Sequence, residues 1–301
     1  MADGSLGPEG LGRLMAELRP RLHRYCAHMV GSAIDGEDVV QEALAKAAEA
    51  FPAAGQIERL ESWLFRIAHN AALDALRRRK RQGVVRSDID LTGFADAGAA
   101  ADTRVAATAS LAALLRLPAT QRSSVVLMDV LGHSLAETAA ILGLSLPAVK
   151  AALHRARARL SERADARADQ APSPAAGPAA GLAAADRTRL RAYADRFNDR
   201  DFDALRDLLA EDVRLELVNR TRLVGRKDVS VYFSRYGATS DWRFSPGLAD
   251  GRPALLVSDP ADAACAIRYV VLLDWADGRI AAIRDFRFAT YVTESLAISR
   301  L

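Results

Sequence analysis

The sequence predicts a multidomain chain: two all-α helical domains, the second a helix-turn-helix, followed by an α+β domain. Three observations predict this order. Apolar residues recur with the helical period up to about residue 162, and strand-like alternation begins only after residue 186. Two stretches, 82–102 and 163–185, are poor in large apolar residues and cannot bury enough surface to offset the entropy of ordering, so we expect linkers there.

These breaks set the expected domain bounds. We expect a helical domain at 11–82, an acidic linker at 83–104, a helix-turn-helix domain at 105–163, an Ala/Pro/Gly linker at 164–185 and an α+β domain at 186–298. The net charge of the 301 residues is only +3, so overall charge does not indicate a nucleic-acid binder. Local clusters of charge carry more information.

Two cysteines, Cys26 and Cys265, lie far apart and have no neighbours at metal-ligand spacing. This excludes a disulfide framework and a cysteine-based zinc site, and it fits a reducing compartment. We find no signal-peptide pattern and no apolar run near the ~18 residues that span a bilayer. We therefore expect a cytoplasmic protein with no membrane partner, no metal and no cofactor.

The segment from Ser134 onward carries the most specific signal, that of a helix-turn-helix. Ser134 and Glu137 form a capping-box pattern that begins one helix. Gly143 follows where a tight turn needs a positive φ, and Ser145 can cap the next helix. A hairpin of two helices with a solvated basic face is the plainer alternative.

The second of these helices has an apolar face and a basic face. At 100° per residue its inward residues are Val149, Leu153, Ala156 and Leu160. A helix of this kind suits the DNA major groove, where arginine and lysine attract phosphates and donate to base edges. The candidate DNA-binding residues are Ser145, Lys150, Ala151, His154, Arg155, Arg157 and Arg159.

A long helix expected at about 59–81 has a polar and aromatic stripe that leads into five consecutive basic residues. Aromatic and amide groups beside arginines can stack on unpaired bases and read their edges. In the alternative, Trp63 belongs to the core and the basic end complements the helix dipole. Asp74 is expected to pair with Arg77 or Arg78. The candidate residues are Trp63, Arg66, Asn70, Arg77, Arg78, Arg79, Lys80 and Arg81.

The preceding helix carries the opposite charge. We expect Asp35 to cap it and Glu37, Asp38, Gln41 and Glu42 to lie off its apolar stripe. Such a face is usually only solvated, but in a protein that docks on a large enzyme it becomes a candidate protein contact.

Together, the stretches 34–42, 63–79 and 117–160 resemble an extracytoplasmic-function (ECF) sigma factor over about residues 11–163. The resemblance implies that the chain directs bacterial core RNA polymerase to promoter DNA and contacts the clamp helices and flap of the polymerase. The acidic linker would thread a basic channel of the polymerase. Catalysis would belong to the polymerase, and we expect no enzyme activity from this chain.

The same resemblance assigns roles to the candidate residues. The basic stripe would read the minus-ten element and the helix-turn-helix the minus-thirty-five element. Ala151 and Ala152 stand where members often carry polar or basic residues, which leaves the base preference open. The polymerase-binding residues would be Asp35, Asp38, Gln41 and Glu42.

The last domain resembles the SnoaL-like fold, a curved sheet that wraps around a helix to form a cone with a pocket. Strands are expected at 213–218, 254–257, 265–274 and 279–288, and a short helix at 228–236. Asp285 could act as a general base, or it could simply be ion-paired with Arg287. Regulation or docking is favoured over catalysis. The candidate pocket residues are Tyr232, Trp242, Tyr269, Asp285 and Arg287.

Three readings of the whole chain therefore compete: a sigma factor, a one-component repressor or activator with a ligand domain, and a cyclase-like enzyme with an incidental DNA-binding half. The region before residue 82 favours the first, because a repressor does not need it. A small ligand and an anti-sigma protein stay open as further partners.

Overall fold

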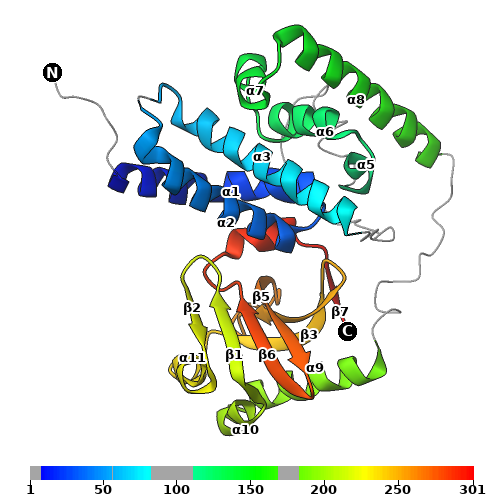
Figure 1. Cartoon of the computed structure of the whole chain (residues 1–301). Helices are drawn as coiled ribbons and strands as arrows, with labels where there is room; N and C mark the ends of the chain where they lie inside the picture. The colour runs from blue at the N-terminus through cyan, green and yellow to red at the C-terminus, as the bar shows by residue number, and fades with distance from the viewer. Residues whose placement is uncertain (1–7, 56, 83–110, 169–182) are drawn as a thin grey trace. The chain divides into compact units, whose positions relative to one another are not determined.

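The computed structural model describes residues 8–55, 57–82, 111–168 and 183–301 (Figure 1). The chain divides into two compact units, residues 1–174 and 175–301. The acidic linker expected at 83–104 lies outside the described residues. The second expected linker is helical at both ends, because one helix continues through Ala168 and the next begins at Ala184.

The first unit opens with helices α1 (Pro8–Val30), α2 (Ala33–Ala50) and α3 (Leu60–Arg81), with a short 3-10 turn at Phe51–Ala53. The apolar stripes of the three helices meet in one core, whose largest buried side chains include Leu22, Tyr25, Met29, Leu64 and Phe65. Helices α1 and α2 cross closely at Gly36, where an added Cβ would lie 2.8 Å from the Cα of Ala27.

The expected cap of α2 is wrong by three residues. Gly31 leaves α1 with a φ of 78°, and Ser32 follows in an extended conformation. The Ser32 side chain accepts the hydrogen bond from the backbone N–H of Asp35 at 3.2 Å, so Ser32 is the N-cap and Asp35 lies inside the first turn.

The first unit continues with short helices and the helix-turn-helix. The elements are α5 (Leu111–Leu115), α6 (Ala119–Val125), a π-helical turn η2 (Val126–Val130), α7 (Leu135–Leu142) and α8 (Leu146–Ala168). In the described part of the chain no single helix is long and apolar enough to cross a membrane, and only α7 and α8 taken together, bent by 101°, reach that length and composition.

The caps that the sequence predicts for the helix-turn-helix are confirmed. Ser134 and Glu137 form a reciprocal capping box before α7, and Gly143 ends α7 with a φ of 65°. Ser145 accepts from the backbone N–H of Ala148 at the start of α8. The four expected inward residues of α8 are all buried, together with Leu114, Leu117, Val125 and Ala139.

The π-helical turn lies between two hydrophobic cores, that of α1 to α3 and that around α8. Its register is set by the hydrogen bond from the backbone N–H of Leu131 to the carbonyl of Val126, five residues back. Val126 and Leu127 are fully buried in the core of α1 to α3, whereas Val125 just before the turn belongs to the core around α8. The two helical parts of the unit are therefore packed together.

The second unit is an α+β domain, as the sequence predicts. Its helices are α9 (Ala184–Asn198), α10 (Phe202–Asp207) and α11 (Arg226–Gly237), and a 3-10 turn spans Thr290–Ser295. Its strands are β1 (Leu209–Leu217), β2 (Thr221–Val224), β3 (Arg243–Ala249), β4 (Arg252–Ser258), β5 (Ile267–Ala276), β6 (Arg279–Asp285) and β7 (Ile298–Arg300).

These strands form one sheet in the order β2-β1-β6-β5-β4-β3-β7, in which only β1 and β6 pair in parallel. Helix α9 packs on β3 and β4, and α11 packs on β1 and β2. The sequence missed β2, β3 and β7. Strand β3 contains Pro246 and Gly247, which disfavour a strand assignment, and Gly247 is needed because a Cβ there would overlap the side chain of Leu256.

Candidate nucleic-acid interface

The exposed face of α8 keeps part of the basic set that the sequence singles out. Lys150, His154 and Arg155 are exposed, and Ala151 is half-buried between them. Ala152, which stands at a position where the sequence analysis expects polar or basic residues in the family, is 2% exposed and belongs to the core. The face therefore combines two cations and a histidine with a small apolar centre.

Two further arginines of the candidate set are exposed but form hydrogen bonds within the protein. Arg157 donates to both carboxylate oxygens of Asp129, at 3.0 and 2.5 Å, and the Asp129 side chain is only 2% exposed. Arg159 donates to the side-chain oxygen of Gln121 at 2.9 Å. These two guanidinium groups hold α8 against η2 and α6, which is a positioning role.

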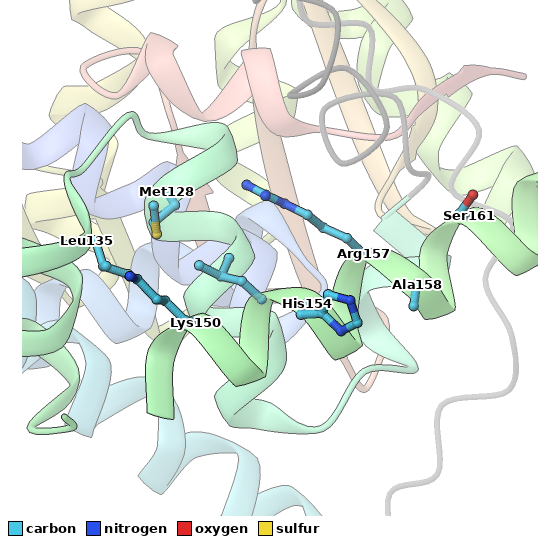
Figure 2. A pocket seen from close by; sticks show the side chains of 8 residues that line it. Met128, Leu135, Lys150, His154, Arg157, Ala158 and Ser161 are labelled. Carbon is cyan, nitrogen blue, oxygen red and sulfur yellow. The ribbon is translucent and has the colours of Figure 1, made fainter. Parts of the chain in front are cut away.

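A groove of about 560 Å³ runs along one side of α8 (Figure 2). Its apolar floor is formed by Met128, Leu135 and Leu153, and Lys150 and His154 line its edge. Arg157, Ala158 and Ser161 complete the lining. The groove borders the basic face, so an occupant of the groove and DNA on that face would contact Lys150 and His154 in common.

On α3, the polar and aromatic stripe is partly engaged. Trp63 is half-buried against the core of the three helices, and its ring lies 6.3 Å from that of Phe51. The guanidinium of Arg66 donates to the backbone carbonyl of Ala140 in α7, through Nε at 3.1 Å and also through Nη2. Asn70 is exposed. Trp63 thus belongs partly to the core, as the plainer alternative held.

The five consecutive basic residues at the end of α3 differ in their surroundings. Arg77 pairs with Asp74 at 3.0 Å, which confirms the expected local partner. Arg78 reaches Glu42 at 2.7 Å and Arg79 reaches Asp35 at 2.5 Å, both on α2. The last two residues of the run, Lys80 and Arg81, are exposed at the end of the helix.

The acidic face of α2 is smaller than the sequence predicts. Glu37 is fully buried and forms an ion pair with Arg19 of α1, so its assignment to a surface face was wrong. Asp38 is exposed, and Gln41 and Glu42 are half-buried. The hydrogen bond from Arg78 lowers the pKa of Glu42, which keeps this carboxylate ionised at neutral pH.

A buried arginine joins the two helical parts of the first unit. Arg122 of α6 is 7% exposed, and it donates to the carbonyl of Met29 in α1 and to those of Leu115 and Leu117, at 2.7 and 3.1 Å. Burial lowers the pKa of Arg122 to about 10, so the group stays charged at neutral pH. Gly31 lies beside it, where a Cβ would overlap the side chain of Leu115.

Helix α7 adds a second set of contacts, this time to α3. Ile141 is fully buried in the core of α1 to α3, and Glu137 lies 3.5 Å from Arg59 at the start of α3. With the Arg66 bond to Ala140, these contacts join α7 to α3, and the Arg66 side chain stays exposed.

In the second unit, Asp285 lies at the centre of a buried hydrogen-bond network. Its carboxylate accepts from the hydroxyls of Tyr232 and Tyr236, at 2.9 and 2.7 Å, and from the backbone N–H of Arg287 at 2.8 Å. The hydroxyl of Tyr236 lies 3.1 Å from that of Tyr269. Burial raises the pKa of Asp285, which opposes its ionisation.

Of the two alternatives left open for Asp285, the ion pair with Arg287 is not the arrangement found in the structure. Strand β6 ends at Asp285, so the alternation along a strand that would place both on one face stops there. The Arg287 side chain instead lies 3.4 Å from Asp241 and over the ring of Tyr236. Trp242 donates to the backbone carbonyl of Tyr236 at 3.1 Å, so Tyr236, which sequence reasoning missed, connects the candidate pocket residues.

Aromatic rings fill the space around this network. Phe197 of α9 is fully buried, and its ring stacks on that of Phe244 at 4.0 Å and meets the rings of Tyr236 and Trp242 edge-on. Among the described residues, no group of three or more His, Cys, Asp and Glu side chains could hold a metal ion.

Comparison with known proteins identifies the parts of the chain. Three family models match: Sigma-70 region 2 over residues 14–82, Sigma-70, region 4 over 109–160 and the SnoaL-like domain over 190–283. The ECF RNA polymerase sigma factor SigM of Mycobacterium tuberculosis is 37% identical over 141 residues, which are 47% of this chain and 70% of SigM. The chain belongs to the ECF sigma factor family.

The chain is similar to further proteins. The ECF sigma factor SigG of Mycobacterium tuberculosis is 34% identical over 167 residues, which cover 47% of this chain and 45% of SigG. Among solved structures, the sigma factor RpoE in complex with the anti-sigma factor NepR from Bartonella quintana has 27% identity and a TM-score of 0.42, and covers 53% of this chain and 98% of RpoE. Mycobacterium tuberculosis SigJ has 20% identity and a TM-score of 0.36, and covers 91% of this chain and 95% of SigJ.

The sequence reading of this ECF sigma factor is confirmed at the level of the family, of its function in directing core RNA polymerase to promoters, and of the SnoaL-like C-terminal domain. The match to region 2 excludes the repressor reading, because the region-2 helices belong to sigma factors. We refer below to α1 to α3 as region 2 and to α5 to α8 as region 4.

Proposed function

We propose that this sigma factor divides promoter recognition among three surfaces. Asp38, Gln41 and Glu42 of α2 contact the clamp helices of the polymerase. Because Asp38 and Glu42 are negatively charged, we expect the surface that they contact to be basic. The exposed end of α3, from Asn70 to Arg81, engages the minus-ten element. The exposed face of α8 enters the major groove of the minus-thirty-five element, and region 4 also contacts the flap.

The observation that carries this proposal is that polar and basic residues of both α3 and α8 are exposed. Lys150, His154 and Arg155 face solvent on α8, and Asn70, Lys80 and Arg81 face solvent on α3. Arg66 is exposed as well and donates to the carbonyl of Ala140 in α7. We assign to the binding of core polymerase any release of this bond that contact with the minus-ten element requires.

The C-terminal domain acts in this scheme as a regulatory module, not as a catalyst. A general base needs an exposed lone pair near its substrate. Asp285 is fully buried, and its carboxylate already accepts three hydrogen bonds from within the domain. Its network is better suited to hold the aromatic core of the domain together.

Run-off transcription with purified core polymerase tests both parts. The full chain should support initiation from a cognate promoter, and a chain ending at Pro174, the boundary of the first unit, should initiate with altered output. The full-length variant Asp285→Asn keeps an acceptor and similar volume but abolishes base catalysis, so it should transcribe like the unmodified chain. Unchanged output from the truncated chain would remove the regulatory role.

Variants on the three surfaces test the division of labour. Asp38→Lys should weaken association with core polymerase, whereas Lys150→Ala should leave that association intact and weaken binding of the holoenzyme to promoter DNA. Loss of polymerase binding in both variants, or in neither, would contradict the proposed assignment.

A further inference from the structure

Leu146 is the first residue of α8, and 46% of it is exposed. The exposed large hydrophobic residues of the described chain are Leu146, Val224, Val231 and Phe288. Leu146 is the one that lies in the sigma-factor unit, among the residues described there. Its neighbours Ser145 and Pro147 are exposed as well, so solvent reaches the leucine from both sides.

Leu146 lies in the part of the helix-turn-helix that contacts DNA bases. In this motif, the N-terminal residues of the second helix contact base edges in the major groove. Lys150 lies one turn later on the same side of α8, and Ala151 lies beside it. An apolar surface next to a cation is therefore presented at the end of the helix that reaches deepest into the groove.

The chemistry of the DNA major groove indicates which group Leu146 would contact. A leucine side chain can neither donate nor accept a hydrogen bond, and the apolar group that a base pair offers in the major groove is the 5-methyl group of thymine. Lys150, one turn along α8, fits DNA, whose phosphates are negative, better than it fits a neutral apolar protein surface.

We propose that Leu146 reads thymine methyl groups in the minus-thirty-five element, while Lys150 supplies phosphate or base-edge contacts. The inference rests on the proposed role of α8 and goes beyond it, because it names the base that this leucine selects.

The experiment uses the full chain assembled with core polymerase. The preferred minus-thirty-five sequence is first selected from DNA randomised over that element. Each thymine of the selected sequence is then replaced by uracil, which removes only the methyl group and keeps base pairing. At one or more positions binding should weaken about four-fold, which corresponds to the ~0.8 kcal/mol of one buried methylene-sized group.

Substitution of Leu146 then tests whether this residue makes the contact with the thymine methyl group. Leu146→Ala should abolish the difference between thymine and uracil at such a position. Val224→Ala, a similar truncation of an exposed residue in the other unit, should leave the difference unchanged. Because Leu146 is exposed, its substitution should not alter the fold, which circular dichroism would verify.

The outcomes separate this inference from the role of α8. If Lys150→Ala and Arg155→Ala do not weaken promoter binding, the proposed role of α8 fails. If they do weaken it but no thymine-to-uracil replacement matters, or if Leu146→Ala keeps the difference, only the methyl-reading inference is overturned. Loss of core-polymerase binding by Leu146→Ala would likewise overturn it, because the leucine would then be a protein contact.

Discussion

The guanidinium of Arg122 in region 4 donates to the backbone carbonyl of Met29 at the end of α1 in region 2. The same group also binds the carbonyls of Leu115 and Leu117, so one side chain ties the end of α1 to the segment that joins α5 to α6. A buried arginine with several carbonyl partners restricts the relative position of the two helical parts more narrowly than apolar packing does, because the N–H donors of its planar guanidinium must align with the carbonyls.

Removal of this arginine should therefore cost more than an ordinary surface substitution. Arg122→Ala leaves three buried carbonyls without their donor, and we expect the free energy of unfolding to fall by roughly 2–4 kcal/mol. Urea unfolding followed by circular dichroism measures this. The exposed Arg155→Ala should change stability by less than about 0.5 kcal/mol, and equal effects of the two substitutions would contradict the role given to Arg122.

The contact of α7 with α3 should depend on its apolar part. Ile141→Ala removes a fully buried side chain from the region-2 core and should destabilise by about 2–4 kcal/mol. Amide hydrogen exchange should rise along α3 at the same time. Arg59→Ala breaks only an exposed ion pair with Glu137 at 3.5 Å and should cost less than about 0.5 kcal/mol. A larger effect of Arg59→Ala would show that charge, not packing, holds α7.

Acid should destabilise the first unit through His69. This histidine is buried, its Nδ1 lies 2.7 Å from the hydroxyl of Tyr25, and burial lowers its pKa from 6.5 to about 4. Between these two values the unfolded chain binds the proton and the folded chain does not, so stability is lost as pH falls from 6.5 toward 4. His69→Gln should flatten the pH dependence of urea unfolding in this range, and an unchanged slope would contradict the assignment.

Asp285 should give the second unit the opposite pH response. Burial raises the pKa of this carboxyl group above its ordinary 3.8, so the folded state binds the proton more tightly than the unfolded state does. The stabilisation is complete below pH 3.8 and is lost as pH rises through the raised pKa. Asp285→Asn should remove this loss, as unfolding of the second unit across pH 4 to 8 would reveal, and persistence of the loss would point to another group.

Two tyrosines near Asp285 should differ when each is changed to phenylalanine. The hydroxyl of Tyr193 is buried and has no hydrogen-bond partner among the described residues, so Tyr193→Phe should be neutral or stabilise by up to about 1 kcal/mol. The hydroxyl of Tyr236 serves both Asp285 and Tyr269, and Tyr236→Phe should destabilise by about 1–3 kcal/mol. The two variants form a matched pair, and a reversed order of stabilities would refute the network.

Some features set by neighbouring residues were predicted from the sequence, although the N-cap of α2 is Ser32 and not the predicted Asp35. The capping box of Ser134 and Glu137 and the positive φ of Gly143 depend on a few adjacent positions, and all are present in the structure. Long-range pairs were not predicted. From the sequence, Glu37 was predicted to be an acidic surface residue. In the structure it is buried and forms an ion pair with Arg19 of another helix, a partner that the sequence does not indicate.

The same limit applies to the C-terminal site. Its candidate residues come from the right strands and helix, but the partner of each depends on where a strand ends, and the sequence does not fix the end of β6 at Asp285. Tyr236 escaped notice because a tyrosine on the buried face of a helix looks like ordinary core. Its hydrogen bonds become visible only once α11 and β6 are brought together.

The extra residue in the π-helical turn at Val126–Val130 makes the spacing of this stretch indispensable. Deletion of one residue there would convert the turn to an ordinary α-helix and rotate every later side chain by about 100° around the axis. Val126 and Leu127 would leave their core, and Asp129 would no longer meet Arg157. The orientation of α8, which we propose to read DNA, thus depends on chain length in this turn, and insertions or deletions there should be far less tolerated than substitutions.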